Sequence, residues 1–401
     1  MPTLLGARRT LLAPGYRTYP LTITGGVITD ATRRLADQGD GVAPSDQSYG
    51  VWPAATNLCT NGGFETDTAG WPLTGLGTNN IESSAEQAKF GSKSGKLTYG
   101  DTLDLAYFPL TVDAVAYAQS IWAYIPTSWD GGQITLAATE QNQANFNMAL
   151  RDQWQSLSNT WTMLAGAKNM LIVRANGGAP TVGRFVYIDG AQIETGSVAT
   201  PYIETDGGTA ASVAGRIQVP NPLSYFTGTE GAVAVRIRMG YAHTLRTSYF
   251  FHLALDANNR VVVYHDGTGN VYTYRVAGGA ANQFGPAVTW AAGDEITVIG
   301  KWTATTLGAS VNGAPFVSGA DAHLPLPTSL DIGSGGVVAA NQEIASTILG
   351  VILFRSGQLT NADSAAINAI MRAKRGALRP RDLPGDCSGV IRGSSGVVIG
   401  R

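Results

Sequence analysis

Charged side chains are scarce in this sequence, where Asp, Glu, Lys and Arg make up 14% of 401 residues. Their signs nearly balance at a net charge of -2, so we predict no nucleic-acid partner. Few Lys and Glu residues argue against helix bundles, whereas 50 Gly residues with frequent Thr, Val and Tyr are typical of short strands joined by turns. The composition therefore predicts an all-β protein, and its length predicts two or three domains.

Cysteine and long apolar runs are almost absent. Cys59 and Cys387 cannot form a disulfide framework, so we expect two unpaired thiols, with a single bridge as the alternative. No segment approaches the roughly 20 apolar residues of a membrane span. Arg8 and Arg9 interrupt the apolar N-terminal residues, which argues against a secretory signal. We therefore expect a soluble protein made in a cytoplasm, without membrane insertion.

Catalytic and metal-binding motifs are missing as well. The 4 histidines are scattered, without the spacing of a metal-binding motif. Asp294 and Glu295 are adjacent, so they point to opposite faces of a strand and cannot act as a catalytic pair. The Gly-rich residues 333–336 lack the Gly-Lys-Ser/Thr of a phosphate loop. We predict that the protein is not an enzyme.

Residues 1–55 are punctuated by proline and glycine and contain one plausible short strand, at 19–24. Such a segment cannot bury enough apolar area to fold alone. We interpret it as an extended N-terminal arm that becomes ordered on a neighbouring subunit or a larger particle. A disordered tail is the alternative.

Residues 56–205 form the first predicted module, with a strand at 117–125 that carries bulky side chains on both faces. The module opens with NLCTNGGFETDTAGW at residues 57–71. This segment resembles the first strand of carbohydrate-binding modules of the galactose-binding-like jelly-roll type. The resemblance implies an antiparallel β-sandwich.

Residues 206–360 form the second predicted module. Val233, Val235 and Ile237 alternate with Ala234 and Arg236, as in a half-buried antiparallel strand. The order of later motifs resembles the concanavalin-like, laminin-G-like jelly roll: Trp302, Asn312-Gly313, Ile332-Gly333 and GVILF at 350–354. The resemblance implies a second β-sandwich in tandem with the first.

Residues 361–401 are predicted to form a short C-terminal helix and an irregular tail. Thr360 and Asp363 fit a capping box at the start of the helix, and Gly376 is suited to end it. The tail is rich in Gly, Pro and Arg.

The connection between the two modules carries the most specific motif. Residues 184–208 read RFVYIDGAQIETGSVATPYIETDGG. This segment resembles the end of jelly-roll modules in bacteriophage virion proteins, where an aromatic strand and Asp precede Gln-Leu-Glu, a Gly turn and Ala-Thr-Pro-Tyr-Ile. The one departure is Ile193 in place of Leu. The resemblance implies a virion structural protein, assembled in the host cytoplasm.

Carbohydrate-binding jelly rolls often hold a structural calcium ion, which prefers carboxylate and carbonyl oxygens. By resemblance, Glu65 and Asp189 would be its side-chain ligands. The alternative is that Glu65 is a surface residue and that Asp189 accepts hydrogen bonds from the backbone.

Sugars stack on aromatic rings, and Tyr264, Tyr272 and Tyr274 are predicted to share one face of a hairpin. Together with Asp266 and Asn270 in the connecting loop, they would form a shallow glycan-binding surface. Packing of the tyrosines against a partner sheet is the alternative. In the first module, Trp129 and Trp154 lie in loop-like sequence and are further candidates for glycan contacts.

Our interpretation is a non-enzymatic phage structural protein of the tail or tail tip that binds host-surface glycans through its sandwiches. We expect the N-terminal arm and C-terminal tail to contact other virion proteins, and we expect a homo-oligomer, with a trimer suggested by analogy with fibre proteins. One alternative is a purely architectural subunit, in the tail or decorating the head, whose sandwiches bind sibling proteins. Another is a polysaccharide-degrading enzyme, which requires two carboxylates roughly 5 to 10 Å apart.

Overall fold

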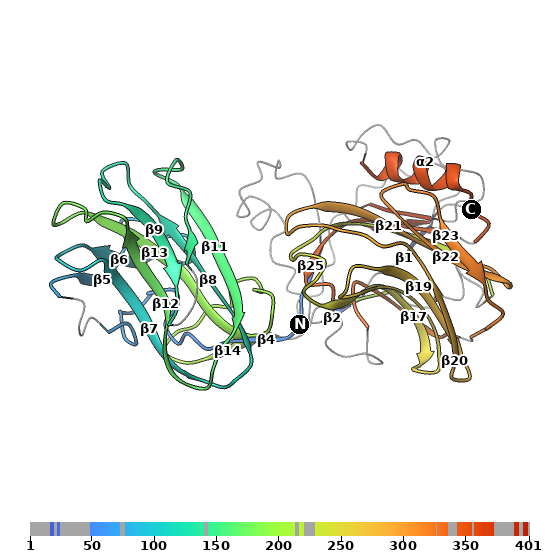
Figure 1. The fold of residues 1–401 in the computed structure, drawn as a ribbon, viewed down its shortest axis with the longest axis horizontal. Coiled ribbons are helices and arrows are strands. Elements are labelled where there is room, and N and C mark those ends of the chain that lie inside the picture. The colour runs from blue at the N-terminus through green and yellow to red at the C-terminus, as the bar shows by residue number, and fades with distance from the viewer. Residues whose placement is uncertain are drawn as a thin grey trace. The chain divides into compact units, whose positions relative to one another are not determined.

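The secondary structure of the described residues is almost entirely antiparallel β-strand (Figure 1), as the composition predicts. The computed structural model describes residues 17–19, 22–24, 49–72, 77–139, 143–212, 216–219, 229–325, 327–335, 343–354, 357–372, 389–392 and 396–399. Two compact units are present. The first unit is built on Ala54–Ser212, and the second on Val213–Arg401 together with strands from the first 53 residues. The fold is a pair of tandem β-sandwiches.

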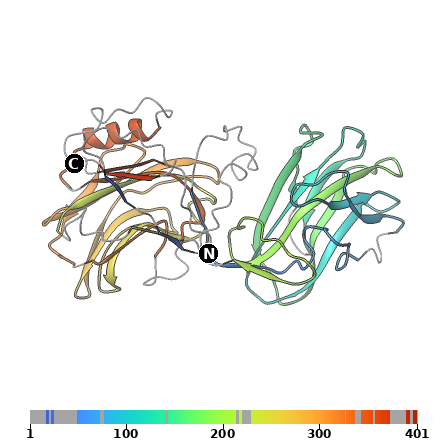
Figure 2. The ribbon, with the colours of Figure 1, turned by 180° about the vertical axis from the view of Figure 1, so that it is seen from behind.

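The first unit contains two main sheets, visible from both sides in Figures 1 and 2. The five-stranded sheet has the order β11-β8-β13-β6-β5, the four-stranded sheet has the order β10-β9-β12-β7, and β4 pairs with β14. The strands are β4 (Ala55–Asn57), β5 (Asn80–Ser84), β6 (Ser94–Thr98), β7 (Asp104–Val112), β8 (Ala116–Tyr124), β9 (Gln133–Ala137), β10 (Ala144–Asn145), β11 (Trp154–Thr162), β12 (Gly166–Asn176), β13 (Phe185–Thr195) and β14 (Ala210–Ser212).

One hydrophobic core fills the first unit. Ile121 of β8 and Leu136 of β9 both belong to it, so the core joins the two main sheets. The opening motif contributes Phe64 and Trp71, whose ring centroids are 5.0 Å apart. Trp71 also packs edge-on against Phe108 of β7 at 5.7 Å. The Gly-Gly-Phe and Gly-Trp segments of the motif therefore each supply one aromatic residue to the core, Phe64 and Trp71.

The connection after β13 is held by a buried polar network. Gln192 Nε2 donates to Glu194 Oε1 at 3.0 Å, and Glu194 accepts hydrogen bonds from the backbone N–H and the hydroxyl of Thr200 at 2.5 and 2.8 Å. The N–H of Ile203 donates to Gln192 Oε1 at 2.7 Å, and Asn57 Nδ2 donates to the Ile203 carbonyl at 2.9 Å. These bonds explain why Gln, Glu and Thr occupy these positions, since buried polar groups need partners.

The second unit contains a nine-stranded and a seven-stranded sheet. The larger has the order β1-β27-β26-β25-β16-β21-β22-β23, with β3 also paired to β25, and the smaller has the order β2-β15-β24-β17-β18-β19-β20. The strands are β1 (Arg17–Tyr19), β2 (Thr22–Thr24), β3 (Tyr49–Val51), β15 (Arg216–Val219), β16 (Gly231–Arg238), β17 (Thr247–Asp256), β18 (Asn259–Asp266), β19 (Val271–Ala277), β20 (Ala280–Phe284), β21 (Glu295–Trp302), β22 (Thr306–Val311), β23 (Val317–Ala320), β24 (Ser329–Ile332), β25 (Ser346–Phe354), β26 (Gly389–Arg392) and β27 (Gly396–Ile399).

Short strands from both ends of the chain add to these sheets. The predicted arm at residues 1–55 lies mostly outside the described residues, but β1, β2 and β3 come from it and pair with β27, β15 and β25 of the same chain. Two described strands, β26 and β27, come from the predicted irregular tail, and β26 pairs with β25. Where they are described, the two terminal segments therefore supply strands to the second unit.

Helix α2 (Asn361–Arg372) packs on the outer face of the nine-stranded sheet (Figure 1). Its Ile367 and Met371 contact a small apolar cluster that includes Ala234 and Ile299. The predicted capping box is confirmed, because Thr360 N donates to Asp363 Oδ2 at 2.7 Å and Asp363 N donates to Thr360 Oγ1 at 3.3 Å. Among the described residues, no helix has the length and apolar character needed to cross a membrane.

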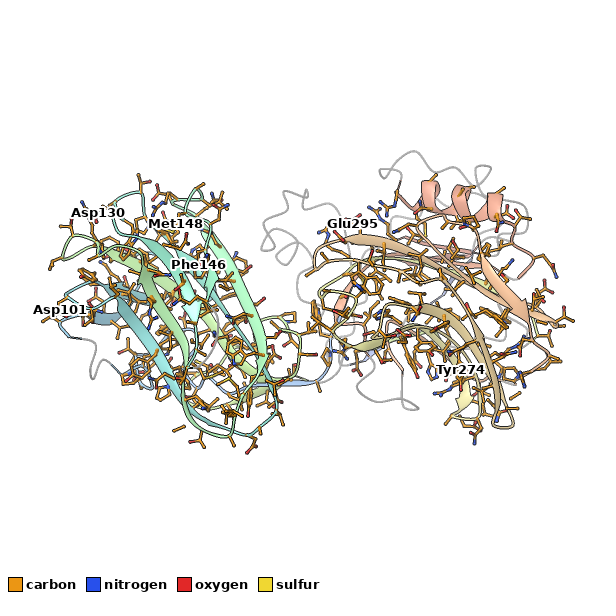
Figure 3. All side chains as sticks on the ribbon, in the orientation of Figure 1. Asp101, Asp130, Phe146, Met148, Tyr274 and Glu295 are labelled. Atoms are coloured by element: carbon orange, nitrogen blue, oxygen red, sulfur yellow. The ribbon has the colours of Figure 1, made fainter. Side chains whose placement is uncertain are left out.

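Alternation along β16 directs Val233, Val235 and Ile237 into the core and the two arginines of the strand to the opposite face. Arg236 and Arg238 face the helix side, and both form ion pairs with Glu295 of β21, which Figure 3 labels. Arg236 Nη1 also donates to the Met371 carbonyl at 2.7 Å, near the end of α2. The helix is therefore attached by charge-assisted hydrogen bonds as well as by apolar contact.

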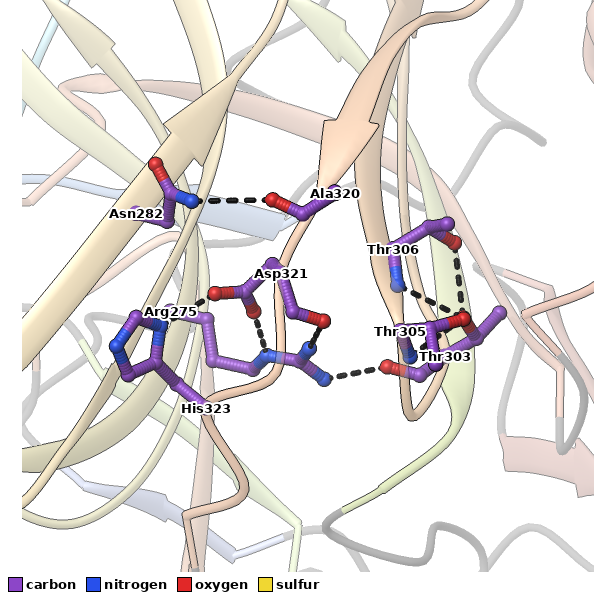
Figure 4. Close-up of polar contacts among 8 residues, drawn as sticks. All are labelled: Arg275, Asn282, Thr303, Thr305, Thr306, Ala320, Asp321 and His323. Atoms are coloured by element: carbon purple, nitrogen blue, oxygen red, sulfur yellow. Dashed lines mark hydrogen bonds and ion pairs between the residues drawn. The ribbon is translucent and has the colours of Figure 1, made fainter.

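A fully buried arginine links the two sheets of the second unit (Figure 4). Arg275 lies on β19, and its Nε donates to Asp321, which follows β23 of the opposite sheet. Its Nη1 donates to the Thr303 carbonyl at 2.6 Å, and Nη2 donates to the Asp321 carbonyl at 3.1 Å. The second Asp321 oxygen bonds to His323 Nδ1. The guanidinium is thus neutralised and satisfied within the core, as burial of a charge requires.

We expect Asp321→Ala to destabilise the second unit by about 3 to 5 kcal/mol, because the Arg275 charge would stay buried without its partner. The double variant Arg275→Met/Asp321→Leu should recover much of this loss, since an apolar pair needs no neutralisation. Chemical denaturation followed by circular dichroism measures both effects, and the first unit serves as the internal reference. Equal losses in the single and double variants would contradict this account.

Candidate functional site

A cluster of tyrosines lies on the outer face of the seven-stranded sheet. Tyr264 of β18 pairs directly with Tyr249 of β17 and Tyr272 of β19, at ring-centroid distances of 5.8 and 5.7 Å. Tyr274 lies 6.1 Å from Tyr264 and is labelled in Figure 3. We refer to these four residues as the tyrosine cluster. Each is partly exposed.

Strand alternation turns the tyrosine cluster away from the core. Val263 and Thr273 point at Gly300 in the opposite sheet, where a Cβ atom on Gly300 would collide with Val263. The neighbouring positions, among them Tyr264 and Tyr272, therefore point outward. A bulge in β17 between Tyr249 and Phe251 shifts the register and brings Tyr249 to the same face. Three of the four tyrosines were expected from their spacing, whereas Tyr249 was not.

Polar groups border the tyrosine cluster. The Tyr264 hydroxyl donates to Gln283 Oε1 of β20 at 2.7 Å. Burial raises the pKa of Tyr264 to about 12, so the hydroxyl stays protonated and remains a donor at neutral pH. The Arg260 guanidinium carbon lies 5.6 Å from the centroid of the Tyr274 ring. The surface therefore combines ring faces with hydroxyl, amide and guanidinium groups.

The two predicted loop contacts, Asp266 and Asn270, bond to their own turn. Asp266 Oδ1 accepts from the N–H groups of Thr268 and Asn270 at 2.8 and 3.1 Å, and Oδ2 accepts from the Thr268 hydroxyl and the Asn270 amide at 2.8 and 2.9 Å. Burial opposes ionisation, but these donors hold the pKa of Asp266 at about 2. Their polar atoms shape the turn between β18 and β19, so the prediction that they contact a ligand is not supported by this geometry.

The exposure expected for Trp129 is wrong. Trp129 follows β8 in a connection, as its sequence suggested, but only 3% of its surface is exposed and its ring belongs to the core of the first unit. Its Nε1 donates to the Gly132 carbonyl at 3.1 Å. Trp154 begins strand β11 rather than lying in a loop, and it is partly exposed. An apolar ring in a loop is buried when the loop folds over the end of the sandwich.

Trp154 belongs to a row of side chains that crosses the five-stranded sheet. The register places Trp154, Tyr124, Tyr187, Lys96 and Glu82 side by side on five successive strands. The Tyr124 ring lies 5.8 Å from Trp154 and 5.9 Å from Tyr187. We refer to these five residues as the aromatic row. Four of them alternate with core residues on their strands, namely Tyr124, Tyr187, Lys96 and Glu82, and therefore point to the other face of the sheet. Tyr187 is nevertheless covered by its neighbours and is buried.

Charged groups close one end of the aromatic row. Lys96 Nζ lies 4.6 Å from the centroid of the Phe185 ring, and it forms ion pairs with Glu86 at 2.9 Å and Glu82 at 3.8 Å. The Tyr187 hydroxyl donates to Glu86. Tyr124, Tyr187 and the charged residues were not selected from the sequence. The spacing of Phe185 and Tyr187 two residues apart indicates that both rings lie on one face of a strand. It does not show which strands lie beside that strand, and these neighbours supply Tyr124 and Lys96.

Glu65 and Asp189 hold the loop between β5 and β6. Glu65 Oε1 accepts from the N–H groups of Ser92 and Lys93 at 2.8 and 3.0 Å, and Oε2 accepts from the Ser92 hydroxyl at 2.7 Å. Asp189 Oδ2 accepts from the N–H groups of Lys89 and Phe90 at 2.8 and 2.9 Å. Both carboxylates therefore bind backbone donors of one loop.

This donor set does not fit a calcium ion. Calcium takes six to eight oxygen ligands, whereas the groups directed at Glu65 and Asp189 are mostly N–H donors, which would repel a cation. Asp189 Oδ1 also accepts from the Gly190 N–H at 2.6 Å. Within the described ranges, no group of three or more His, Cys, Asp or Glu residues is placed to hold a metal. The geometry matches hydrogen-bonded carboxylates, the alternative interpretation of these two residues.

The pKa values of the two carboxyl groups shift in opposite directions, because Asp189 is more deeply buried than Glu65. Burial is the largest influence on Asp189 and raises its pKa to about 7, against the effect of its three N–H donors. Glu65 is also affected by burial, but the donors of Lys93 and Ser92 prevail and lower its pKa.

The two cysteines were expected to be unpaired thiols. Cys59 is a buried free thiol whose pKa is raised by burial, and Cys387 lies outside the described residues.

Comparison with known proteins gives no match of the sequence to a family model or a curated protein. The fold is similar to solved β-sandwiches, including a SAP-like pentraxin from Limulus polyphemus (15% identity, 43% of this chain, 82% of that chain, TM-score 0.30). A second is the CBM22-1 xylan-binding domain of Paenibacillus barcinonensis Xyn10C (16% identity, 36% of this chain, 94% of that chain, TM-score 0.25). A third is mouse laminin alpha1 LG4-5 (9% identity, 64% of this chain, 89% of that chain, TM-score 0.28). The structural neighbours include carbohydrate-binding modules and laminin G domains, but at these scores they identify no ligand for this chain.

The raised pKa of Asp189 predicts a pH dependence of stability. A carboxyl whose pKa is raised on folding binds its proton more tightly in the folded state, so stability falls as pH rises from about 4 to about 7. Asp189→Asn should flatten this decline in the first unit, even if the variant is less stable at every pH. Melting temperatures across this range test the slope, and an unchanged slope in the variant would refute the assignment.

The N–H donors around Glu65 and Asp189 predict indifference to calcium. We expect the melting temperature of the full chain to be the same in excess Ca²⁺ and in EDTA, because a ligand raises it only by binding the folded state. The variant Glu65→Gln provides the control. A calcium-dependent rise that disappears in this variant would restore the calcium site.

Proposed function

We propose that the protein binds glycans through the tyrosine cluster and catalyses no reaction. The observation that carries this proposal is the set of partly exposed tyrosine rings on an outward sheet face. Sugars bind aromatic rings through their apolar faces and bind neighbouring polar groups through their hydroxyls. Gln283 and the tyrosine hydroxyls would supply the polar contacts. A shallow surface of this kind predicts weak binding by each copy.

The aromatic row supports a second glycan-binding surface in the first unit. Trp154 and Tyr124 are partly exposed, and Lys96, Glu82 and Glu86 lie at the end of the row. Tyr187 in the middle of the row is buried at 3% exposure, so the Trp154 and Tyr124 rings and the charged groups are the parts that would contact a sugar. Two separate surfaces on one chain would raise the effective affinity through multivalency.

The carboxylates beside these surfaces favour binding over catalysis. Glycoside hydrolysis requires two carboxyl groups free to act on one bond. Asp266 is engaged by four donors of its turn, and Glu82 and Glu86 form ion pairs with Lys96. These engagements support the non-enzymatic interpretation over polysaccharide degradation.

For the biological setting, we propose a bacteriophage virion, in the tail or tail tip, with host-surface glycans as ligands. The support is the resemblance of residues 184–208 to virion proteins. In this proposal the terminal segments contact other virion proteins, and the chain forms a homo-oligomer whose copies add their weak binding. The alternative is a purely architectural subunit, in which the tyrosine cluster would be covered by a sibling protein.

We expect the triple variant Tyr264→Ala/Tyr272→Ala/Tyr274→Ala to lose glycan binding. The variant removes three of the four rings that would contact the sugar, so binding should weaken by roughly ten-fold or more, which corresponds to about 1.4 kcal/mol. A glycan array and host-cell binding with the full chain measure the effect. The matched variant Tyr124→Ala/Trp154→Ala separates the contribution of the aromatic row. Absence of binding by folded, multimeric wild-type protein would favour the architectural subunit.

A further inference from the structure

Arg260 is placed at one end of the tyrosine cluster. It lies on β18, four residues before Tyr264, and therefore on the same face of the sheet. Its direct cross-strand neighbours are Ala254 and Val276, which offer no side-chain acceptor. Its guanidinium carbon lies 5.6 Å from the centroid of the Tyr274 ring. The aromatic contact orients the cation beside the rings and reduces its hydration.

The charge of Arg260 is not neutralised within the described part of the chain. No described carboxylate forms an ion pair with it, and its Nε is buried without a hydrogen-bond partner. Other arginines of this unit differ: Arg236 and Arg238 pair with Glu295, and Arg275 pairs with Asp321. A guanidinium presents five donors in a fixed fork, so one without a protein acceptor can accommodate an acceptor from outside.

Arg260 and Asp266 lie toward opposite ends of the tyrosine cluster. Each end also has a residue of the other sign nearby: Asp256 pairs with Asn259 beside Arg260, and Arg246 precedes Thr247, the partner of Asp266. Asp266 lies on the same strand six residues after Arg260, a separation of about 20 Å along an extended chain. The Asp266 carboxylate is ionised, because its turn donors hold the pKa at about 2. An anionic group on a bound ligand would therefore be attracted by the Arg260 guanidinium and repelled by the Asp266 carboxylate.

We propose that the tyrosine cluster binds an acidic glycan and that Arg260 binds the carboxylate of a uronic acid in it. This inference rests on the glycan-binding function proposed above and specifies its ligand. A carboxylate matches the guanidinium fork with two parallel hydrogen bonds, which no neutral sugar hydroxyl can reproduce. The tyrosine rings would bind the sugar faces, and Arg260 would select the charge.

The test compares two matched ligands on the full chain by calorimetry: oligogalacturonate, and the same oligosaccharide with its carboxyl groups reduced to alcohols. We expect the acidic ligand to bind with roughly ten-fold or greater affinity than the reduced one. The reason is that a hydrogen bond to a charged group contributes more free energy than a ten-fold change in affinity requires. The preference should shrink as salt is added. Arg260→Gln should weaken only the acidic ligand, to the level of the reduced one, and Arg260→Lys should be intermediate.

Arg184→Gln is the matched control. It removes the same charge from the first unit, where Arg184 forms a partly exposed ion pair with Asp130 at 3.1 Å, and it should leave both affinities unchanged. Equal binding of the two ligands by wild type, or equal weakening of both by Arg260→Gln, would overturn the role of Arg260 while leaving glycan binding intact. Arg260-dependent binding of dextran sulfate as tight as that of oligogalacturonate would overturn the carboxylate assignment. If neither oligosaccharide binds and the glycan array shows no ligand, both this inference and the proposed function fail.

Discussion

The register between β18 and β19 is the constraint on which the candidate site depends. Side chains alternate strictly across a strand, so a shift of one residue would move Tyr264 into the core and Val263 into solvent. The opposite sheet opposes this shift, because Val263 and Thr273 pack so closely on Gly300 that a Cβ atom there would lie 2.2 Å from Val263 and 2.8 Å from Thr273. The outward tyrosine cluster is therefore a consequence of inward packing, and substitutions at Gly300 would alter a surface on the far side of the sheet.

Buried polar groups give each unit its specific arrangement. In the second unit, Arg275 and Asp321 make a contact between sheets that only one alignment satisfies, since a displaced guanidinium would lose its acceptors. In the first unit, Gln192 and Glu194 fix the chain after β13 in the same manner. Apolar residues supply most of the driving force for folding, whereas these polar contacts would lose their partners in a displaced packing.

The features that could be predicted from the sequence are those that depend on residues close together in the chain. The alternation of Val233, Val235 and Ile237, the cap at Thr360 and the common face of the hairpin tyrosines all follow from neighbouring residues. Long-range pairing did not, because the contact of Tyr124 with Tyr187 depends on a register between strands that are distant in sequence. The exposure expected for Trp129 was wrong for a related reason: an aromatic residue in a loop is equally suited to fold stability and to ligand contact until its neighbours are known.

The network around Gln192 also determines how the first unit would respond to a pulling force. Tension applied to the chain after β14 first meets the β14–β4 pairs and the hydrogen bond of the Thr205 hydroxyl to the Cys59 carbonyl. It then meets the hydrogen bonds that hold Ile203 to Gln192 and Asn57, before it reaches the pairs of β13. The Asn57 and Gln192 side chains that hold Ile203 are themselves buried in the first unit. The connection can thus act as a mechanical clamp that keeps the sandwich folded while load passes along the chain.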